Sequence, residues 1–115
     1  MVTKLRPTVY MTQEGHFDYS GADDYGELKF ITAEDFNSAP NSIINTQVIN
    51  DIVGALRDFN KESDWVIASG SPYITAIVFL VLGLMGIESV NILRWDNRSR
   101  KYNELTINLI EWGVG

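Results

Sequence analysis

The sequence feature that most restricts the fold is a buried strand that runs through a tight turn into a strongly apolar helix. A strand is predicted at residues 64–69, and its residues 65–68 are apolar on both alternating faces, as expected of a central parallel strand that is covered by other layers. In the turn that follows, Ser71 is a favourable helix N-cap, and Pro72 loses no hydrogen bond at the first helical position. The helix is expected to end near Gly86. This β-α-β unit predicts an α/β fold.

The apolar run at residues 73–87 raises the question of a membrane segment. As a helix, its fifteen residues would be about 22 Å long, against a hydrocarbon core of about 30 Å. Strand-like segments also flank it closely on both sides. We therefore expect a crossover helix packed in a protein core, and no membrane association.

The rest of the chain alternates between strand and helix patterns. Strands are predicted at residues 7–13, 27–32, 89–95 and 101–110, and an amphipathic helix at residues 44–60. With the unit above, the order along the chain is β-β-α-β-α-β-β. We expect one α/β domain over residues 1–115, with a mixed five-stranded sheet, two helices and a C-terminal antiparallel hairpin. Three parallel strands with an antiparallel edge would satisfy this order.

The amino-acid composition excludes several kinds of catalytic and metal-binding site. The 115-residue chain has no cysteine and a single histidine, His16, so thiolate nucleophiles, disulfides and cysteine-based metal sites are excluded. No catalytic group, metal site or cofactor is expected. The first residues lack the apolar run of a signal peptide, so we expect a cytoplasmic protein.

The turn before the apolar helix is the first candidate site. A strand-to-helix turn directs N–H groups and the helix dipole at the carboxyl edge of the sheet, where phosphates and carboxylates bind. An anion would contact Ser69, Gly70, Ser71 and Tyr73. The turn lacks the lysine and glycines of a P-loop, so the other interpretation is that Ser71 serves only as a cap.

An acidic segment is the second candidate. Residues 14–35 contain seven carboxylates and one lysine, interleaved with aromatic residues. Such a surface would bind a protein partner, because the aromatic residues supply contact area and the acids select basic groups. The residues assigned to it are Asp18, Tyr19, Asp23, Asp24 and Tyr25. The alternative is a solubilising loop whose tyrosines cover the sheet.

A basic hairpin is the third candidate. Arg94, Arg98, Arg100 and Lys101 lie near one predicted turn, with only Asp96 among them. They could contact nucleic-acid phosphates while Trp95 or Tyr102 offers a stacking face. The formal net charge of −6 opposes nucleic-acid binding. The alternative is that these charges only discourage pairing of the edge strand.

Several short motifs together resemble small proteins of tailed bacteriophages for which no activity is known. They are Tyr25-Gly26-Glu27-Leu28, Asp58-Phe59-Asn60, the Gly-Ser-Pro turn, and Leu93-Arg94-Trp95-Asp96 with Arg98 and Tyr102. The resemblance implies a phage protein that acts in the cytoplasm of an infected host. It assigns no functional residue.

These observations favour a non-enzymatic acidic interaction protein that binds and modulates a host or defence factor. A binder or processor of a small phosphorylated ligand, such as a nucleotide, at the turn around Ser71 is the alternative. Nucleic-acid contact through the Arg98 hairpin is a second alternative. Self-association is a further expectation, through the last strand or through Trp112 and Val114. Whether any catalysis occurs is left open.

Overall fold

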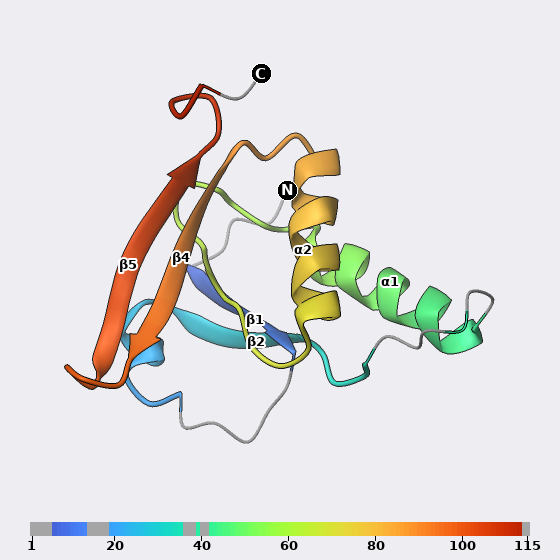
Figure 1. The fold of residues 1–115 in the computed structure, drawn as a ribbon, viewed down its shortest axis with the longest axis horizontal. Coiled ribbons are helices and arrows are strands. Elements are labelled where there is room, and N and C mark those ends of the chain that lie inside the picture. Colours follow the sequence, from blue (N-terminus) through green and yellow to red (C-terminus); the bar gives the residue numbers. More distant parts are fainter. Residues whose placement is uncertain (1–5, 14–18, 36–38, 40–41, 114–115) are drawn as a thin grey trace.

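The computed structural model describes residues 6–13, 19–35, 39 and 42–113 and confirms the predicted α/β fold (Figure 1). Its elements are β1 (Thr8–Gln13), the short 3-10 helix η1 (Ala22–Asp24), β2 (Glu27–Thr32), α1 (Ile43–Leu56), β3 (Trp65–Ile67), α2 (Pro72–Leu84), β4 (Ser89–Asp96) and β5 (Lys101–Asn108). The five strands form one mixed sheet, and β4 and β5 form the expected antiparallel hairpin.

The strand order is β2-β1-β3-β4-β5, and the first four strands are parallel. The sequence had suggested three parallel strands, and that number is wrong because β1 and β2 are also parallel, with Thr8 opposite Glu27. The reason is the length of their connection. Parallel neighbours need a crossover of a dozen or more residues, and residues 14–26 supply it. β5 lies at the edge, as predicted.

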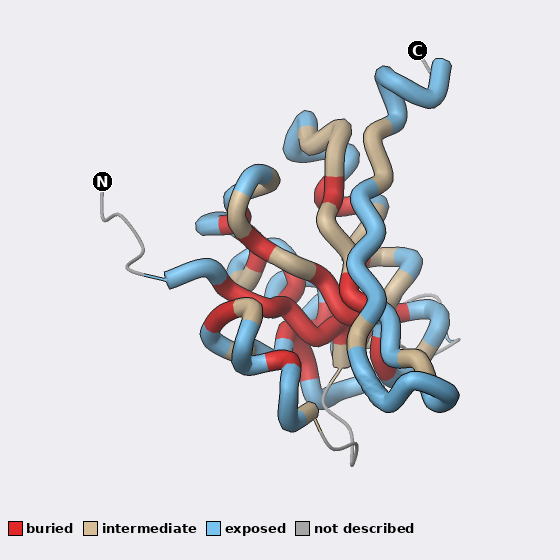
Figure 2. The backbone as a smooth tube through the Cα atoms, turned by 90° about the vertical axis from the view of Figure 1, so that its left-hand side faces the viewer, coloured by how far each residue is buried: buried red, intermediate tan, exposed pale blue. Residues whose placement is uncertain are grey.

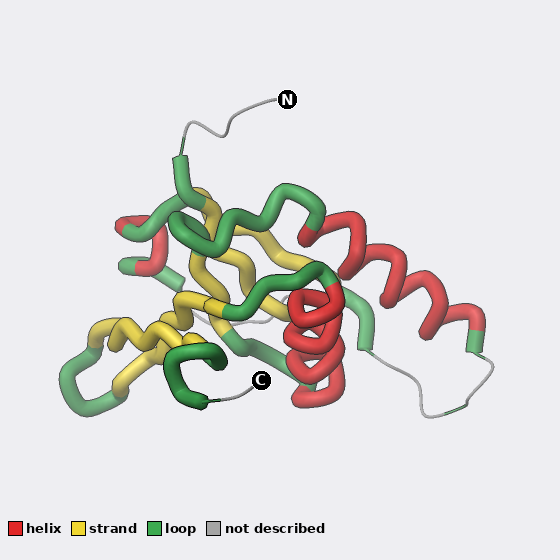
Figure 3. The backbone as a smooth tube through the Cα atoms, turned by 90° about the horizontal axis from the view of Figure 1, so that it is seen from above, coloured by secondary structure: helices red, strands yellow, loops and turns green. Residues whose placement is uncertain are grey.

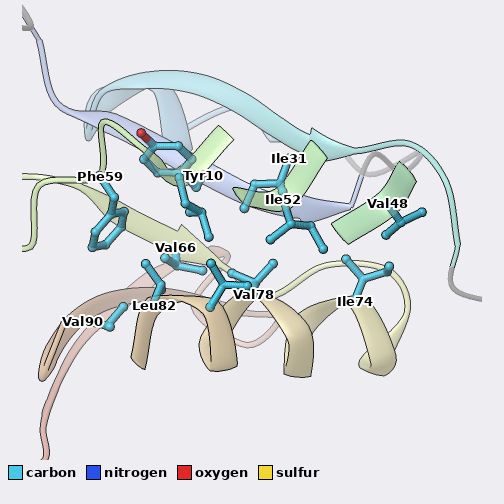
Figure 4. Close-up of a cluster of buried hydrophobic side chains, with 12 residues drawn as sticks. Tyr10, Ile31, Val48, Ile52, Phe59, Val66, Ile74, Val78, Leu82 and Val90 are labelled. Carbon is cyan, nitrogen blue, oxygen red and sulfur yellow. The ribbon is translucent and has the colours of Figure 1, made fainter. Parts of the chain in front are cut away.

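Both helices lie on one face of the sheet (Figure 1). The helix-side core packs α1 and α2 against the strands, with Tyr10, Val66 and Val90 on the strand side (Figure 4). The opposite face carries a second cluster, with Val9, Met11 and Leu93, covered by the segment around η1. The chain moves from β1 to β2 in one direction and from β2 through β3 to β4 in the other. Right-handed crossovers therefore place the first connection on the face opposite to the helices.

The helix α1 ends at Leu56, four residues before the predicted end at Asn60. The chain turns there because the N–H of Phe59 donates to the Leu56 carbonyl at 3.0 Å. The buried carboxylate of Asp64 then accepts the N–H of Asn60 at 2.8 Å and the N–H of Thr8 at 2.8 Å. This carboxylate joins the turn before β3 to the first residue of β1.

The helix α2 begins as the sequence predicts. Ser71 is the N-cap, its hydroxyl accepts the N–H of Tyr73 at 3.2 Å, and Pro72 is the first helical residue. Gly86 adopts a left-handed φ of 83° after the last turn. Neither described helix has the length and apolarity that a membrane crossing requires.

The expectation that α2 is explained by core packing is only half right. Ile74, Val78, Val81 and Leu82 are buried, but Tyr73, Leu80 and Leu84 on the other side are exposed. A helix that is apolar all round carries no sequence signal for which side is covered. Figure 2 shows the buried residues at the centre of the molecule and exposed residues along β5.

Candidate functional site

A groove opens where β3 ends and β4 continues. The register between the two strands stops at Val66 and Ile92, whereas β4 extends to Asp96. After β3 the chain turns toward β1, because the hydroxyl of Thr12 accepts the N–H of Ser69 at 2.8 Å and lies 2.7 Å from the Ser69 carbonyl, to which it donates. The outer half of the β4–β5 hairpin therefore projects past the neighbouring strand.

The groove has a volume of about 1270 Å³ and lies at the carboxyl end of β3. Its lining residues come from three parts of the chain: Tyr19, Ser20, Gly21, Asp24 and Tyr25; Ile67, Ala68, Ser69 and Gly70; and Ile92, Leu93, Arg94, Trp95, Asn97, Arg100, Lys101, Tyr102 and Leu105. The structure thus brings together parts of all three candidate sites from the sequence. In open α/β sheets this edge, beside the strand where the order reverses, is the usual binding position.

One side of β4 lacks a strand neighbour in the groove. In an antiparallel pair, alternate residues direct their backbone groups toward the partner strand and away from it. β5 pairs with all of β4, but in the described part of the chain no strand pairs with the other side of residues 93–96. This side of β4 is an open strand edge inside a groove. The sequence analysis missed this edge because it predicted strands of similar length at residues 64–69 and 89–95, whereas β3 has three residues and β4 has eight.

Aromatic rings line the groove beside this edge. Trp95 and Tyr102 lie opposite each other on β4 and β5, with ring centroids 5.1 Å apart. The ring of Tyr25 packs on Trp65 at 5.2 Å, and its hydroxyl donates to Glu104 on β5 at 3.1 Å. Partial desolvation, with the Glu104 contact second, raises the pKa of Tyr25. Tyr25 thus connects the η1 segment to the hairpin.

The basic residues fall into two groups. Arg94, Arg100 and Lys101 line the groove, whereas Arg98 does not. Asp96 organises the turn between them. Its carboxylate accepts the N–H of Arg98 at 2.9 Å and the hydroxyl of Ser99 at 3.0 Å, and these bonds lower its pKa, the Arg98 bond most.

The described acidic residues of the second candidate do not gather on one face. Only Asp24 among them lines the groove. Asp23 instead shapes its own turn, where its carboxylate accepts the N–H of Gly21 at 3.2 Å. Glu27 begins β2 and Glu34 follows the end of the same strand, so they lie toward opposite ends of the sheet. Tyr19 and Tyr25 do lie in the groove, and Asp18 is outside the described residues.

In the turn that was predicted to bind an anion, a side chain of the protein itself accepts the N–H of Ser71. The Oε1 atom of Gln13 accepts the N–H of Ser71 at 2.5 Å, and its Nε2 donates to the Glu34 carbonyl at 3.1 Å. A Cβ at Gly70 would lie 2.0 Å from that Oε1, so the turn accommodates Gln13 only with glycine there. The sequence analysis missed Gln13. Anion binding at this turn stays a prediction, and an anion would have to displace an existing hydrogen bond to Ser71.

Histidine and the acidic side chains are the remaining candidates for catalysis or metal binding. His16 lies outside the described residues. Across the part of the chain that the structure describes, histidine, aspartate and glutamate side chains nowhere gather in a group of three or more that could hold a metal ion. The groove instead offers an open strand edge, aromatic rings and basic side chains, a combination suited to binding.

A family model described as phage Pam3 gp32-like protein matches residues 7–109, which include every strand and helix and the whole groove. No curated protein and no solved structure shows significant similarity to the chain.

Proposed function

The chain belongs to the phage Pam3 gp32-like protein family, and from this premise we propose that it binds an extended segment of a host or defence protein in the groove beside β4. The family match confirms the phage context that the sequence resemblance implied. The proposal places the protein in the cytoplasm of the infected host, where it modulates its partner by binding and not by catalysis.

The observation that carries this proposal is the open edge of β4. An extended peptide can add to such an edge as a further strand, with main-chain hydrogen bonds supplying affinity and pockets for alternate side chains supplying specificity. Because alternate residues of β4 face the groove, about two of residues 93–96 offer their backbone N–H and C=O groups to an added chain. The groove between them and Ser69-Gly70 gives the added chain a place to lie.

The rings and charges around the edge indicate the kind of segment. Tyrosine, tryptophan and arginine are enriched at the energetic centres of protein interfaces, and all three line the groove. Its charged side chains are Arg94, Arg100 and Lys101 against Asp24. The groove therefore favours an acidic segment with an apolar or aromatic side chain, although the chain as a whole is acidic. The sequence analysis had predicted the opposite sign, a basic partner selected by the acidic residues within 14–35.

Charge reversal tests the groove and the sign of its partner together. The wild-type protein and the variants Arg94→Glu, Arg100→Glu and Asp24→Lys are used to capture proteins from host lysate. The matched control is Arg57→Glu, an exposed arginine that follows α1 and does not line the groove. We expect both groove arginine variants to lose the captured partner, and the control and Asp24→Lys to retain it. Loss with Asp24→Lys and retention with the arginine variants would instead support a basic partner.

A second experiment tests strand addition directly. Once the captured segment is known, synthetic peptides with single N-methylated backbone amides are titrated against the protein. An added strand directs every second amide at β4, so N-methylation should weaken binding at alternate positions. Equal effects at successive positions, or no effect, would contradict strand addition even if the groove is the binding site.

Nucleic-acid binding through the hairpin makes a different prediction. Phosphate contacts depend on the total basic charge of the hairpin and weaken steeply with salt. Arg98→Glu should then be as damaging as Arg100→Glu, although Arg98 does not line the groove. The groove proposal predicts loss with Arg100→Glu and little change with Arg98→Glu.

A further inference from the structure

The open strand position beside residues 93–96 of β4 is closed at its inner end by the protein's own chain. β3 pairs with β4 as far as Val66 and Ile92, so an added strand can begin only beyond that point. There the chain turns toward β1, and the hydroxyl of Thr12 fixes the turn by accepting the N–H of Ser69 at 2.8 Å. A segment in the groove therefore cannot continue along the line of β3.

The walls of the groove restrict the path of the segment further. One wall comes from the segment around η1, and Tyr25 connects it to β5 through its hydrogen bond to Glu104. Of the described residues that line the groove, none belongs to α1 or α2, and Figure 3 shows the turn of the hairpin and η1 on the side of the molecule away from both helices. The outer end of the groove is therefore open. An internal segment would have to bend sharply at Ala68 to leave the inner end, whereas a chain that stops there needs no bend.

We infer that the groove takes the C-terminal end of its partner protein, with the last residue at the inner end and the terminal carboxylate beside Arg94. This inference rests on the proposed function and names the kind of segment that is bound. A chain in this position runs antiparallel to β4, so its carboxyl end points inward. About two residues of β4 offer backbone groups to it, which is a short contact for strand addition. A captured terminal carboxylate supplies a further polar contact.

The charges of the groove favour a carboxyl end over an amino end. Arg94 lies two residues beyond the last pairing of β3 with β4, and its neighbour across the hairpin is the uncharged Asn103. Its guanidinium is exposed, and in the described part of the chain no carboxylate pairs with it. Such a group binds a carboxylate through two parallel hydrogen bonds. An amino end would instead meet three basic residues against Asp24 alone.

The lining of the groove also indicates the sequence of the bound end. Apolar residues line its inner end, so an apolar last side chain fits there; they are Ile67, Ala68, Ile92 and Leu93. Arg100 and Lys101 lie farther out, at the turn of the hairpin. At about 3.3 Å per residue, they face positions roughly three to five residues before the end of an extended chain. The expected partner thus ends in an apolar residue that follows acidic ones.

Peptide display tests whether a free chain end is required. One library carries random heptapeptides at the free C-terminus of a carrier protein, and the other carries them between two carrier segments. We expect the wild-type protein to enrich peptides from the free-end library alone, with the sequence pattern above. Enrichment from both libraries, or from neither, would overturn the recognition of a chain end. Binders from the internal library that are lost with Arg100→Glu would overturn it while leaving the proposed groove binding intact.

The terminal carboxylate is tested by a cycle of peptide and protein variants. The best free-end peptide is prepared as the acid and as the C-terminal amide, and the amide should bind the wild-type protein about tenfold or more weakly. With Arg94→Met the two forms should differ by less than about twofold, because the group that recognises the carboxylate is absent. Arg100→Met is the matched control, since it should weaken the acid and the amide by the same factor.

Both arginines are exposed, so both variants should fold as the wild type does, which circular dichroism checks. A preference for the acid that survives Arg94→Met would contradict the assignment of Arg94. Binding that is lost on acetylation of a free amino end and on Asp24→Lys would reverse the direction of the chain and overturn the inference.

Discussion

Replacement of Gln13 by alanine tests whether the turn before α2 is a filled cap or an anion site. Gln13 provides the acceptor for the N–H of Ser71, a partly buried group at 2.5 Å. An N–H of this kind that loses its acceptor costs about 1–3 kcal/mol. The second bond of Gln13, to the Glu34 carbonyl, is exposed and adds little. We therefore expect Gln13→Ala to lower the free energy of unfolding by about 2 kcal/mol.

Thermal and urea unfolding, followed by circular dichroism, measure this effect. For a domain of this size, about 2 kcal/mol corresponds to a decrease in Tm of roughly 8 °C. Gln47→Ala is the matched control, because Gln47 is an exposed glutamine on α1 and its loss should change stability by less than about 0.5 kcal/mol. A Gln13→Ala variant as stable as this control would refute the idea that Gln13 stabilises the turn by accepting the N–H of Ser71.

Adding phosphate tests whether the same turn binds anions. The wild-type turn already has a ligand in Gln13, so phosphate and a nucleotide panel should leave its Tm unchanged relative to chloride at equal ionic strength. Gln13→Ala exposes the N–H of Ser71 at a helix N-terminus, so phosphate should stabilise this variant more than the wild type. Stabilisation of the wild-type protein by a nucleotide would restore the phosphorylated-ligand alternative.

Three further outcomes follow from buried groups and glycines. Asp64→Ala should cost about 2–5 kcal/mol in urea unfolding, because two backbone N–H groups lose their acceptor, whereas Ala at the exposed Glu62 should cost less than about 0.5 kcal/mol. Burial, with Asp64 and Asp58 next, raises the pKa of Tyr10 from 10.0 to about 12. The stabilisation from its neutral form is thus complete below pH 10 and is lost as the pH rises to 12, in total about 3 kcal/mol. Tyr10→Phe should therefore remove the decrease in stability between pH 10 and pH 12. Gly54→Ala at an exposed position in the last turn of α1 should raise stability by about 0.5–1 kcal/mol, and an unchanged or lower Tm would contradict the open space around it.

The local signals in the sequence predicted most of the fold because each element is defined by neighbouring residues. Ser71 and Pro72 marked the start of α2, and β2 matched its predicted bounds. The end of α1 was missed because it depends on Asp64, whose carboxylate holds the turn at Asn60. Parallel pairing of β1 and β2 depends on the length of the segment between them, and that was the available but unused signal.

The candidate site was less predictable because it is assembled from residues that lie far apart in the chain. Tyr25 and Glu104 are separated by 79 residues, and no local pattern indicates that they meet. Arg98 and Arg100 are almost adjacent, yet only Arg100 lines the groove. Gln13 looked like the ordinary end of a strand, and its role appears only when the turn around Ser71 lies beside it.

The sheet order also has a consequence for synthesis on the ribosome. The interior strand β1 is made early, but one of its two neighbours, β3, follows much later: Thr8 and Asp64, whose hydrogen bond links the starts of the two strands, are 56 residues apart. At 5–20 residues per second, β1 waits about 3–11 s for that neighbour. The β4–β5 hairpin, in contrast, pairs across a short turn and can close as soon as it emerges. The sheet can therefore become continuous only after β3 has been made, because β3 lies between the β2–β1 pair and the hairpin.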